Sequence, residues 1–459
     1  MNRFNPKNFK LSPVQIIPAS FLITIMTGAL LLMIPAASAA GQHTDFVTAL
    51  FTATTSICVT GLVVVDTYAH WSLFGQFIIL ILIQIGGLGM IAIASMIMIL
   101  THRKFSLTDR ILLKDAFNLN TDTKLLTFLI RVVKGIMIVE GTGAILYSFV
   151  FVPQFGLAKG LWCSLFNSVS AFCNAGMDVI GANSLGDYSG SIIVMLVTCL
   201  LIIFGGIGFV VWFDVTDRIK EGIRKEFRVR TVIKRLSEHS KLAIVFTLIL
   251  ILAGMLAFLV FEYNNPRTLG PMGFGSKLVN ALFESVTTRT AGFATFAQDG
   301  LTGASCITAY ILMFIGGSPI GTAGGVKTIT FFLLIMNLRS YLGNRNENVI
   351  FGRRVSEESM RKAAAIVFVS MLTVLLLTVA LVVFNPVNLE DALFEVFSAC
   401  GTVGLTRALT PELNTAARIV IIIAMYLGRI GPISMAALFS VNDSDSNKIR
   451  HSEGIFYVG

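Results

Sequence analysis

The strongest constraint on the fold is a short segment that occurs four times along the chain. Each copy runs from a Leu-Phe pair to a glycine. The copies are Leu50-Phe51 to Gly61, Leu165-Phe166 to Gly176, Leu282-Phe283 to Gly292, and Leu393-Phe394 to Gly404. Successive glycines are 115, 116 and 112 residues apart, a period too even for chance. The sequence therefore predicts four equivalent structural units.

Each copy lies between two long apolar stretches. For example, the first copy is followed by Phe77–Leu100, and the third copy is preceded by Leu242–Phe261. These stretches reach the ~20 residues that a membrane-spanning helix needs. Only 13% of the chain is charged and the mean hydropathy is +0.80, which excludes a soluble multi-domain protein. The copies themselves are too short to span. We therefore expect each unit to be a helix, a short re-entrant pore helix, a glycine loop and a second helix.

The expected fold is an all-α polytopic membrane protein with eight transmembrane helices and four re-entrant pore helices. The expected spans are 14–36 and 72–100, 124–152 and 190–215, 241–262 and 304–338, and 363–384 and 415–440. The repeats are then 14–100, 124–215, 241–338 and 363–440. Residues 1–13 and 441–459 form an N-terminal segment and a C-terminal tail.

Basic residues gather in alternate connections, notably Arg218–Lys241 and Arg339–Lys362, and at both ends of the chain. The positive-inside rule places these connections and both termini in the cytoplasm of a multi-pass cell-membrane protein. The net charge of +9 is thus interpreted as an orientation signal and an attraction to membrane lipid, without nucleic-acid binding. All four glycine loops fall on the opposite side. Parallel units of this kind favour a pseudo-fourfold central pore over inverted repeats.

The three residues that end each copy are candidate ion ligands in a selectivity filter. They are Val59, Thr60 and Gly61; Asn174, Ala175 and Gly176; Thr290, Ala291 and Gly292; and Thr402, Val403 and Gly404. None is acidic, so the filter would coordinate a cation through backbone carbonyls, which favours K⁺ over Ca²⁺. Glycine permits φ > 0, so carbonyls can point inward. The alternative is that each glycine only permits a tight turn.

The second helix of the third unit contains a glycine-rich stretch that cannot remain helical. We predict a gate there, formed by Gly316, Gly317, Ser318, Pro319, Gly321, Thr322, Gly324 and Gly325. Arg429 interrupts another apolar helix, and a charge at this depth is costly, so it is also assigned to the gate. A packed helix kink and a structural cap remain the respective alternatives.

These loops, with Gly86-Gly87-Leu88-Gly89, Gly205-Gly206-Ile207-Gly208 and Gly428-Arg429-Ile430-Gly431, resemble the Trk/Ktr/HKT superfamily of potassium transporters over essentially the whole chain. The similarity is greatest to the membrane subunits of bacterial Ktr systems. It implies K⁺ uptake, an intramembrane gating loop that contacts an arginine, a homodimer with one pore per subunit, and a ring of nucleotide-binding cytoplasmic regulatory subunits. It implies no covalent cofactor. Activation by Na⁺ is left open.

Two other functional classes are weaker. A gradient-coupled secondary transporter should carry several ionisable residues at the midplane, and only Arg429 and Glu140 qualify. An intramembrane enzyme should show a nucleophile or paired acids in spanning helices, and none of the five histidines is midmembrane. We therefore expect no enzymatic activity. Glu284 and Glu395 are interpreted as partners of pore-helix N-termini.

Overall fold

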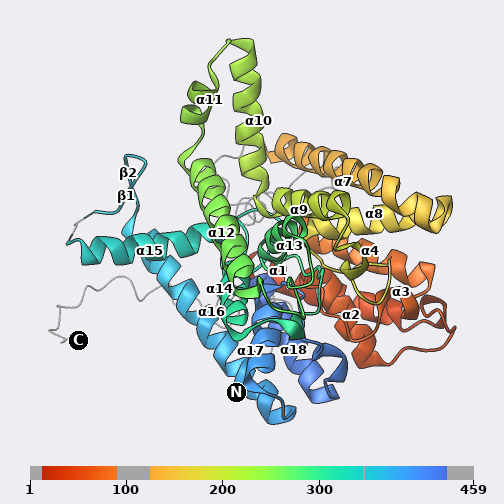
Figure 1. Cartoon of the computed structure of the whole chain (residues 1–459). Helices are drawn as coiled ribbons and strands as arrows, with labels where there is room; N and C mark the ends of the chain where they lie inside the picture. The colour runs from red at the N-terminus through yellow and green to blue at the C-terminus, as the bar shows by residue number, and fades with distance from the viewer. Residues whose placement is uncertain (1–12, 90–124, 345–346, 432–459) are drawn as a thin grey trace, which may run out of the picture.

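The computed structural model describes residues 13–89, 125–344 and 347–431, and this part of the chain is mostly α-helical (Figure 1). Within those ranges the only strands are β1 (Val349–Ile350) and β2 (Arg353–Arg354), which pair antiparallel with Val349 opposite Arg354. The predicted termini and the first basic loop lie outside the described residues, apart from a few residues at their edges.

Three consecutive helices form the core of each of four groups, in the predicted order. They are α1 (Pro13–Leu32), α2 (Phe46–Cys58) and α4 (Leu73–Leu88); α7 (Leu125–Phe155), α8 (Leu157–Cys173) and α9 (Ile192–Gly206); α12 (Glu238–Glu262), α13 (Phe274–Thr287) and α14 (Gly303–Phe314); and α16 (Glu357–Phe384), α17 (Leu389–Gly401) and α18 (Thr415–Ile430). The remaining helices are α3 (Thr67–His70), α10 (Phe209–Arg224), α11 (Val229–Arg235) and α15 (Thr328–Leu342), with short 3-10 turns at 35–37, 186–188, 298–300 and 410–412.

The four groups pack in a closed ring. The last helix of each group lies against the short middle helix of the next group: α4 on α8, α9 on α13, α14 on α17, and α18 on α2. The cycle returns to its first member, so the middle helices surround one axis. Their apolar residues recur at helical spacing and are buried on this inner side, which gives one continuous core.

Not every predicted span is one straight helix. Within the described ranges, Phe128–Phe155, α12 and α16 are long and apolar enough to cross a membrane alone. The predicted span 190–215 instead bends by 98° between α9 and α10, because Gly208 takes φ +94. The helices α4 and α18 end in the same way, before Gly89 and Gly431 with φ +82 and +86. The total of eight spans remains a prediction.

The third group contains the predicted helix break. The helix α14 stops at Phe314 and α15 starts at Thr328, so residues 315–327 form a non-helical segment, here called the gate loop. Elsewhere, α10 and α11 form a hairpin that projects from the body of the molecule (Figure 1). Its side chains Ile223 and Val229 are about three-quarters exposed, at 76% and 74%.

Candidate ion pathway

Three of the middle helices end immediately before the predicted filter residues, and α13 ends at Thr287, two residues earlier. Val59, Asn174 and Thr402 are the C-caps of α2, α8 and α17, and their φ values of 55°, 61° and 52° lie in the left-handed region. Thr290, at the matching position after α13, has φ 78°. Such conformations are uncommon for side chains that carry a Cβ. The turn redirects the backbone from each helix into the axis, as the glycine pattern predicted.

The four filter glycines meet in a closed ring. A Cβ on Gly61 would lie 3.2 Å from the Cα of Gly176, and one on Gly176 would lie 2.8 Å from the Cα of Gly292. A Cβ on Gly292 would lie 3.1 Å from the Cα of Gly404, and one on Gly404 would lie 2.8 Å from the Cα of Gly61, which closes the ring. Each would also collide with the carbonyl oxygen that precedes the neighbouring glycine. All four have positive φ. Only glycine fits this approach, and four loops separated by over a hundred residues become neighbours.

A hydroxyl near the end of each middle helix holds the adjoining loop. Thr55 accepts the N–H of Gly61 at 2.9 Å, Ser170 accepts that of Met177 at 3.1 Å, and Ser398 accepts that of Gly404 at 3.0 Å. In the third loop Thr287 donates to the carbonyl of Phe293 at 2.7 Å. Sequence reasoning missed these residues. A hydroxyl six positions before the glycine in three of the four copies was the available signal.

We expect Ser398→Ala to weaken ion binding. The change leaves the buried N–H of Gly404 without a partner, which costs ~1–3 kcal/mol and loosens the loop. Half-saturation of Rb⁺ uptake should rise by about fivefold or more. Ser148→Ala, at an exposed position on α7, is the control and should leave uptake unchanged. Equal half-saturation in both variants would show that the hydroxyl does not hold the loop.

Three buried side-chain oxygens in this region have no hydrogen-bond partner among the described residues: Thr60 Oγ1, Asn174 Oδ1 and Thr402 Oγ1. Most buried polar atoms in proteins are paired, so unpaired oxygens in these three segments call for an explanation. They are concentrated in the segments that carry the filter glycines. Oxygens left free in this way are suited to replace the hydration shell of a cation.

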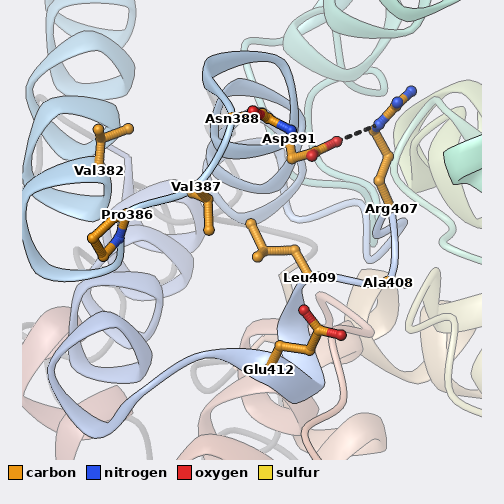
Figure 2. Close-up of a pocket in the computed structure, with 9 residues that line it drawn as sticks. All are labelled: Val382, Pro386, Val387, Asn388, Asp391, Arg407, Ala408, Leu409 and Glu412. Carbon is orange, nitrogen blue, oxygen red and sulfur yellow. Dashed lines mark hydrogen bonds and ion pairs between the residues drawn. The ribbon is translucent and has the colours of Figure 1, made fainter.

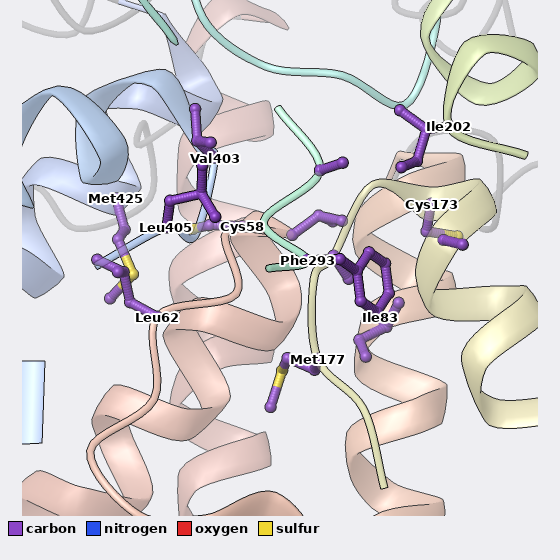
Figure 3. Close-up of a cluster of buried hydrophobic side chains, with 14 of the residues drawn as sticks. Cys58, Leu62, Ile83, Cys173, Met177, Ile202, Phe293, Val403, Leu405 and Met425 are labelled. Carbon is purple, nitrogen blue, oxygen red and sulfur yellow. The ribbon is translucent and has the colours of Figure 1, made fainter. Parts of the chain in front are cut away.

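Apolar side chains pack behind the ring. The residues after the four glycines, Leu62, Met177, Phe293 and Leu405, are each at most 1% exposed. Figure 3 shows them in one cluster with Ile83, Ile202 and Met425 from the last helices of three groups. This packing contributes roughly 1.5–3 kcal/mol for each fully buried side chain, so it holds the loops rigidly.

A cavity of about 580 Å³ opens on one side of the glycine ring, here called the vestibule. It is lined by the four glycines and by the segments that follow them. Its acidic residues are Asp66, Asp178, Asp187 and Asp299. Asp66 and Asp178 follow the first and second of the four glycines in the sequence. Clustered carboxylates give such a cleft a negative potential that concentrates cations.

A second cavity, of about 630 Å³, lies beside the vestibule and contains no predicted filter residue (Figure 2). Ala408 lines both cavities, so the segment around it is the wall between them. Arg407 fixes that wall through a 2.7 Å ion pair from its Nε to Asp391, drawn in Figure 2. The side cavity therefore belongs to the scaffold of the fourth loop.

The interpretation of Glu284 and Glu395 as partners of helix N-termini is wrong. Glu284 lies in the last turn of α13 and Glu395 at the middle of α17, and both are fully buried. Glu395 accepts hydrogen bonds from the hydroxyls of Thr406, at 2.8 Å, and Thr410, while Glu284 accepts one from the Gln298 amide at 3.3 Å. Each carboxyl thus holds the segment that leaves its own filter loop. The sequence gives the positions of these two residues along the chain, but it does not clearly mark the first residue of the helix that contains each of them.

The gate loop lies on the side of the ring opposite the vestibule. A Cβ on Gly324 would collide with the side chain of Thr402, and Thr322 Oγ1 donates to the Phe172 carbonyl at 3.1 Å. The loop therefore contacts the residues that precede the filter glycines, whereas the vestibule is lined by residues that follow them. The gate loop thus lies directly against two filter loops.

Two helices hold the gate loop from outside. The backbone N–H groups of Ser318 and Thr322 donate to the carbonyls of Gly206 and Gly205, at 2.8 and 3.1 Å, and Phe209 N–H donates to Ile320 O at 2.9 Å. Ile320 itself has φ 60°, which is strained for a β-branched residue. A strained segment held by a few backbone hydrogen bonds is suited to adopt a second position.

Arg429 reaches the gate loop from α18. Its guanidinium donates to the carbonyl oxygens of Thr322 and Gly86. Lys327 Nζ donates to Ala323 O at 2.6 Å and so also binds the loop. The structure brings together Arg429 and every predicted filter and gate residue around one axis. Among the described residues, no group of three or more His, Cys, Asp or Glu side chains forms a metal site.

Residues 7–450 match the sequence profile of a family described as TrkH, cation transport protein. The chain is 38% identical to the potassium/sodium uptake protein NtpJ of Enterococcus hirae, covering 97% of both chains. It is 37% identical to the Ktr system potassium uptake protein B of Bacillus subtilis, over 98% of this chain and 97% of that one. The crystal structure of the potassium transporter TrkH from Vibrio parahaemolyticus superposes with a TM-score of 0.73 at 17% identity, covering 96% of this chain and 87% of that chain. That likeness concerns the fold.

Proposed function

The chain belongs to the TrkH family of cation transport proteins, and from this premise we propose that it is a potassium uptake protein. In this proposal the four loops ending at Gly61, Gly176, Gly292 and Gly404 form a carbonyl-lined filter for dehydrated K⁺. The closed ring of these glycines is the observation that carries it. The unpaired oxygens beside the ring and the acidic vestibule on one side support the same path.

The gate loop and Arg429 regulate the path in this proposal. The gate loop packs against the two segments that carry Asn174 and Thr402. It lies on the side of the glycine ring away from the vestibule, and there it obstructs ion passage. The positive charge of Arg429 on the loop carbonyls adds an electrostatic barrier to a cation. Movement of the loop away from the axis would remove both the steric obstruction and the electrostatic barrier.

The proposed orientation places the vestibule outside and the gate loop, both termini and the α10–α11 hairpin in the cytoplasm. The relatives named for the Ktr system support a cytoplasmic regulatory subunit as partner. Exposed Ile223 and Val229, flanked by Arg224 and Arg228, offer that subunit an apolar and basic docking surface. We further propose a ring of nucleotide-binding regulatory subunits and a homodimer in which every subunit has its own pore.

A second candidate, gradient-coupled symport, rests on Glu140. This carboxyl is 5% exposed in the spanning helix α7, and the Gln84 amide donates to it at 3.3 Å. A buried acid inside a span is a common coupling site in transporters. Cys173 Sγ, immediately before the filter residue Asn174, also contacts this carboxyl at 3.8 Å, so Glu140 lies behind the second filter loop and outside the lining of the vestibule.

Purified protein in liposomes tests the proposal. Rb⁺ should enter down its gradient, K⁺ should compete strongly, and Na⁺ should compete weakly. Absence of Rb⁺ flux from a correctly folded protein, in the presence and absence of a regulatory subunit, would reject the filter assignment. Uptake that requires an imposed H⁺ or Na⁺ gradient, and that Glu140→Gln abolishes, would favour symport.

Uptake should also depend on pH through the vestibule. Burial raises the pKa of Asp178 to about 6, although the N–H of Ile180 donates to its carboxyl. The carboxyl is therefore charged at neutral pH and becomes neutral as the pH falls through this value, which removes negative potential. Half-saturation for Rb⁺ should rise about two- to threefold between about pH 7.5 and about pH 5. Asp178→Asn should show the higher value at every pH; an unchanged pH profile in this variant would contradict the assignment.

A further inference from the structure

Arg289 has a place in the fold that no sequence argument assigned to it. In the structure it is 7% exposed and lies immediately before the filter residue Thr290. Its Nη2 donates to the carbonyl of Gly316, the second residue of the gate loop, at 3.3 Å. One side chain thus joins the third filter loop to the gate loop.

The comparison among the four groups shows why an arginine occurs here. In the other three, a glycine of the last helix packs directly on the end of the middle helix: Gly86 on the Ile57 carbonyl, Gly205 on that of Phe172, and Gly428 on that of Cys400. The positions equivalent to Arg289, three residues before each filter glycine, are small: Cys58, Cys173 and Gly401.

In the third group the helix is unwound at this level. Gly316 and Gly317 lie against the gate loop itself and against Gly206 of α9, instead of against the end of α13. The guanidinium of Arg289 lies at this junction, beside a small cavity of about 20 Å³ lined also by Val286 and Gly317. It therefore takes the place of the helix contact that the break removes.

The electrostatic surroundings of Arg289 are unfavourable for a purely structural residue. Across the described ranges no carboxylate lies within ion-pair distance of it, and its Nε has no hydrogen-bond partner. An unpaired charge buried in a membrane protein is costly, and an apolar side chain of equal length would avoid that cost. The cost is understandable if the charged contact with the loop has a function.

We propose that Arg289 is a second latch of the gate loop, a positioning residue that binds Gly316 from the filter side while Arg429 binds Thr322 from α18. This inference rests on the proposed gating role of the loop. With one latch on each flank, the loop is released only when both contacts break. Because Arg289 adjoins Thr290, loop movement and the conformation of the third filter loop are coupled.

The experiment measures Rb⁺ flux through the protein alone in liposomes, for wild type, Arg289→Met, Arg429→Ala and the double variant. Arg289→Met should raise flux by about tenfold, since it removes one charge-assisted hydrogen bond. Because release requires both contacts to break, the two free energies add, and the double variant should approach the product of the two single effects until the open state predominates. Stabilisation against heat by K⁺ identifies variants whose filter is intact.

The outcomes separate this inference from the proposed function. Raised flux in Arg429→Ala with wild-type flux in folded Arg289→Met, or a double variant whose flux equals that of Arg429→Ala while the latter is still below its maximum, would overturn the second latch and leave the gate in place. Wild-type flux in both single variants would reject the loop as the gate. Arg289→Gln, which is shorter and neutral, serves if Arg289→Met does not fold: it should also raise flux, and a folded Arg289→Gln protein with wild-type flux would overturn the proposal.

Discussion

Replacing Gly404 with serine should lower K⁺ uptake on the order of 100-fold. Gly404 has φ +98, a conformation that costs a residue with a side chain roughly 1–3 kcal/mol. The new Cβ would also lie 2.8 Å from the Cα of Gly61 and collide with the carbonyl oxygen of Thr60. That oxygen is a proposed ion ligand. The strain and the displaced ligand together account for the expected loss, since about 1.4 kcal/mol corresponds to tenfold.

The measurement is the half-saturation and maximal rate of Rb⁺ uptake in liposomes, with Na⁺ as competitor. Gly303→Ser is the matched control, because nothing lies within 4 Å of a Cβ at Gly303 and the residue begins α14 away from the ring. The control should retain wild-type uptake. If Gly404→Ser retains it too, Gly404 does not line the path. Gly61→Ser, at the neighbouring position of the ring, should reproduce the loss.

Replacing Arg429 with alanine should raise the flux of the protein without its regulatory partner by roughly ten- to a hundredfold. Two hydrogen bonds from a charged donor, each worth about 1.5–3 kcal/mol, would disappear, and the blocked state would lose part of that stability. The barrier from the positive charge would disappear as well. Removal of residues within 316–325 should act in the same direction, because less chain remains to obstruct the path.

Arg418→Ala is the matched control for Arg429→Ala. Arg418 lies on the same helix, α18, but donates to Pro411 near the vestibule end, away from the gate loop. Its replacement should leave basal flux unchanged. If Arg429→Ala and the shortened loop are as tightly closed as wild type, the barrier to ions lies elsewhere in the chain. Equal increases in Arg429→Ala and Arg418→Ala would indicate a general loosening of α18.

The structure bears out much of the local sequence interpretation because that interpretation rested on patterns within short segments. The period of the four glycines predicted four short helices ending in turns with positive φ, and Gly-Gly-Ser-Pro predicted the break between α14 and α15. Both follow from backbone sterics, which depend on neighbouring residues alone. The same reasoning failed at Gly208, where a glycine inside an apolar run was taken as part of one continuous span.

Side-chain roles that depend on long-range contacts could not be predicted in this way. In the sequence, Ser170 and Ser398 are indistinguishable from other hydroxyl residues of the pore helices. Their hydrogen bonds to the loop backbone are visible only in the folded structure. Glu284 and Glu395 were assigned to helix N-termini, although they lie in the last turn of α13 and at the middle of α17, because the helix starts are weakly marked in the sequence. Arg289 received no role from the sequence, since the only hydrogen-bond partner of its side chain among the described residues is 27 positions away along the chain.

By itself, the sequence determined the membrane environment, the number of equivalent filter segments and the residues with unusual backbone freedom, because hydropathy and glycine sterics are local properties. The tertiary structure alone decided that the four glycines meet in one ring and that two arginines bind opposite flanks of the gate loop. The physical reason is that the last helix of each group packs on the middle helix of the next. Only when this cycle closes do loops more than a hundred residues apart become neighbours.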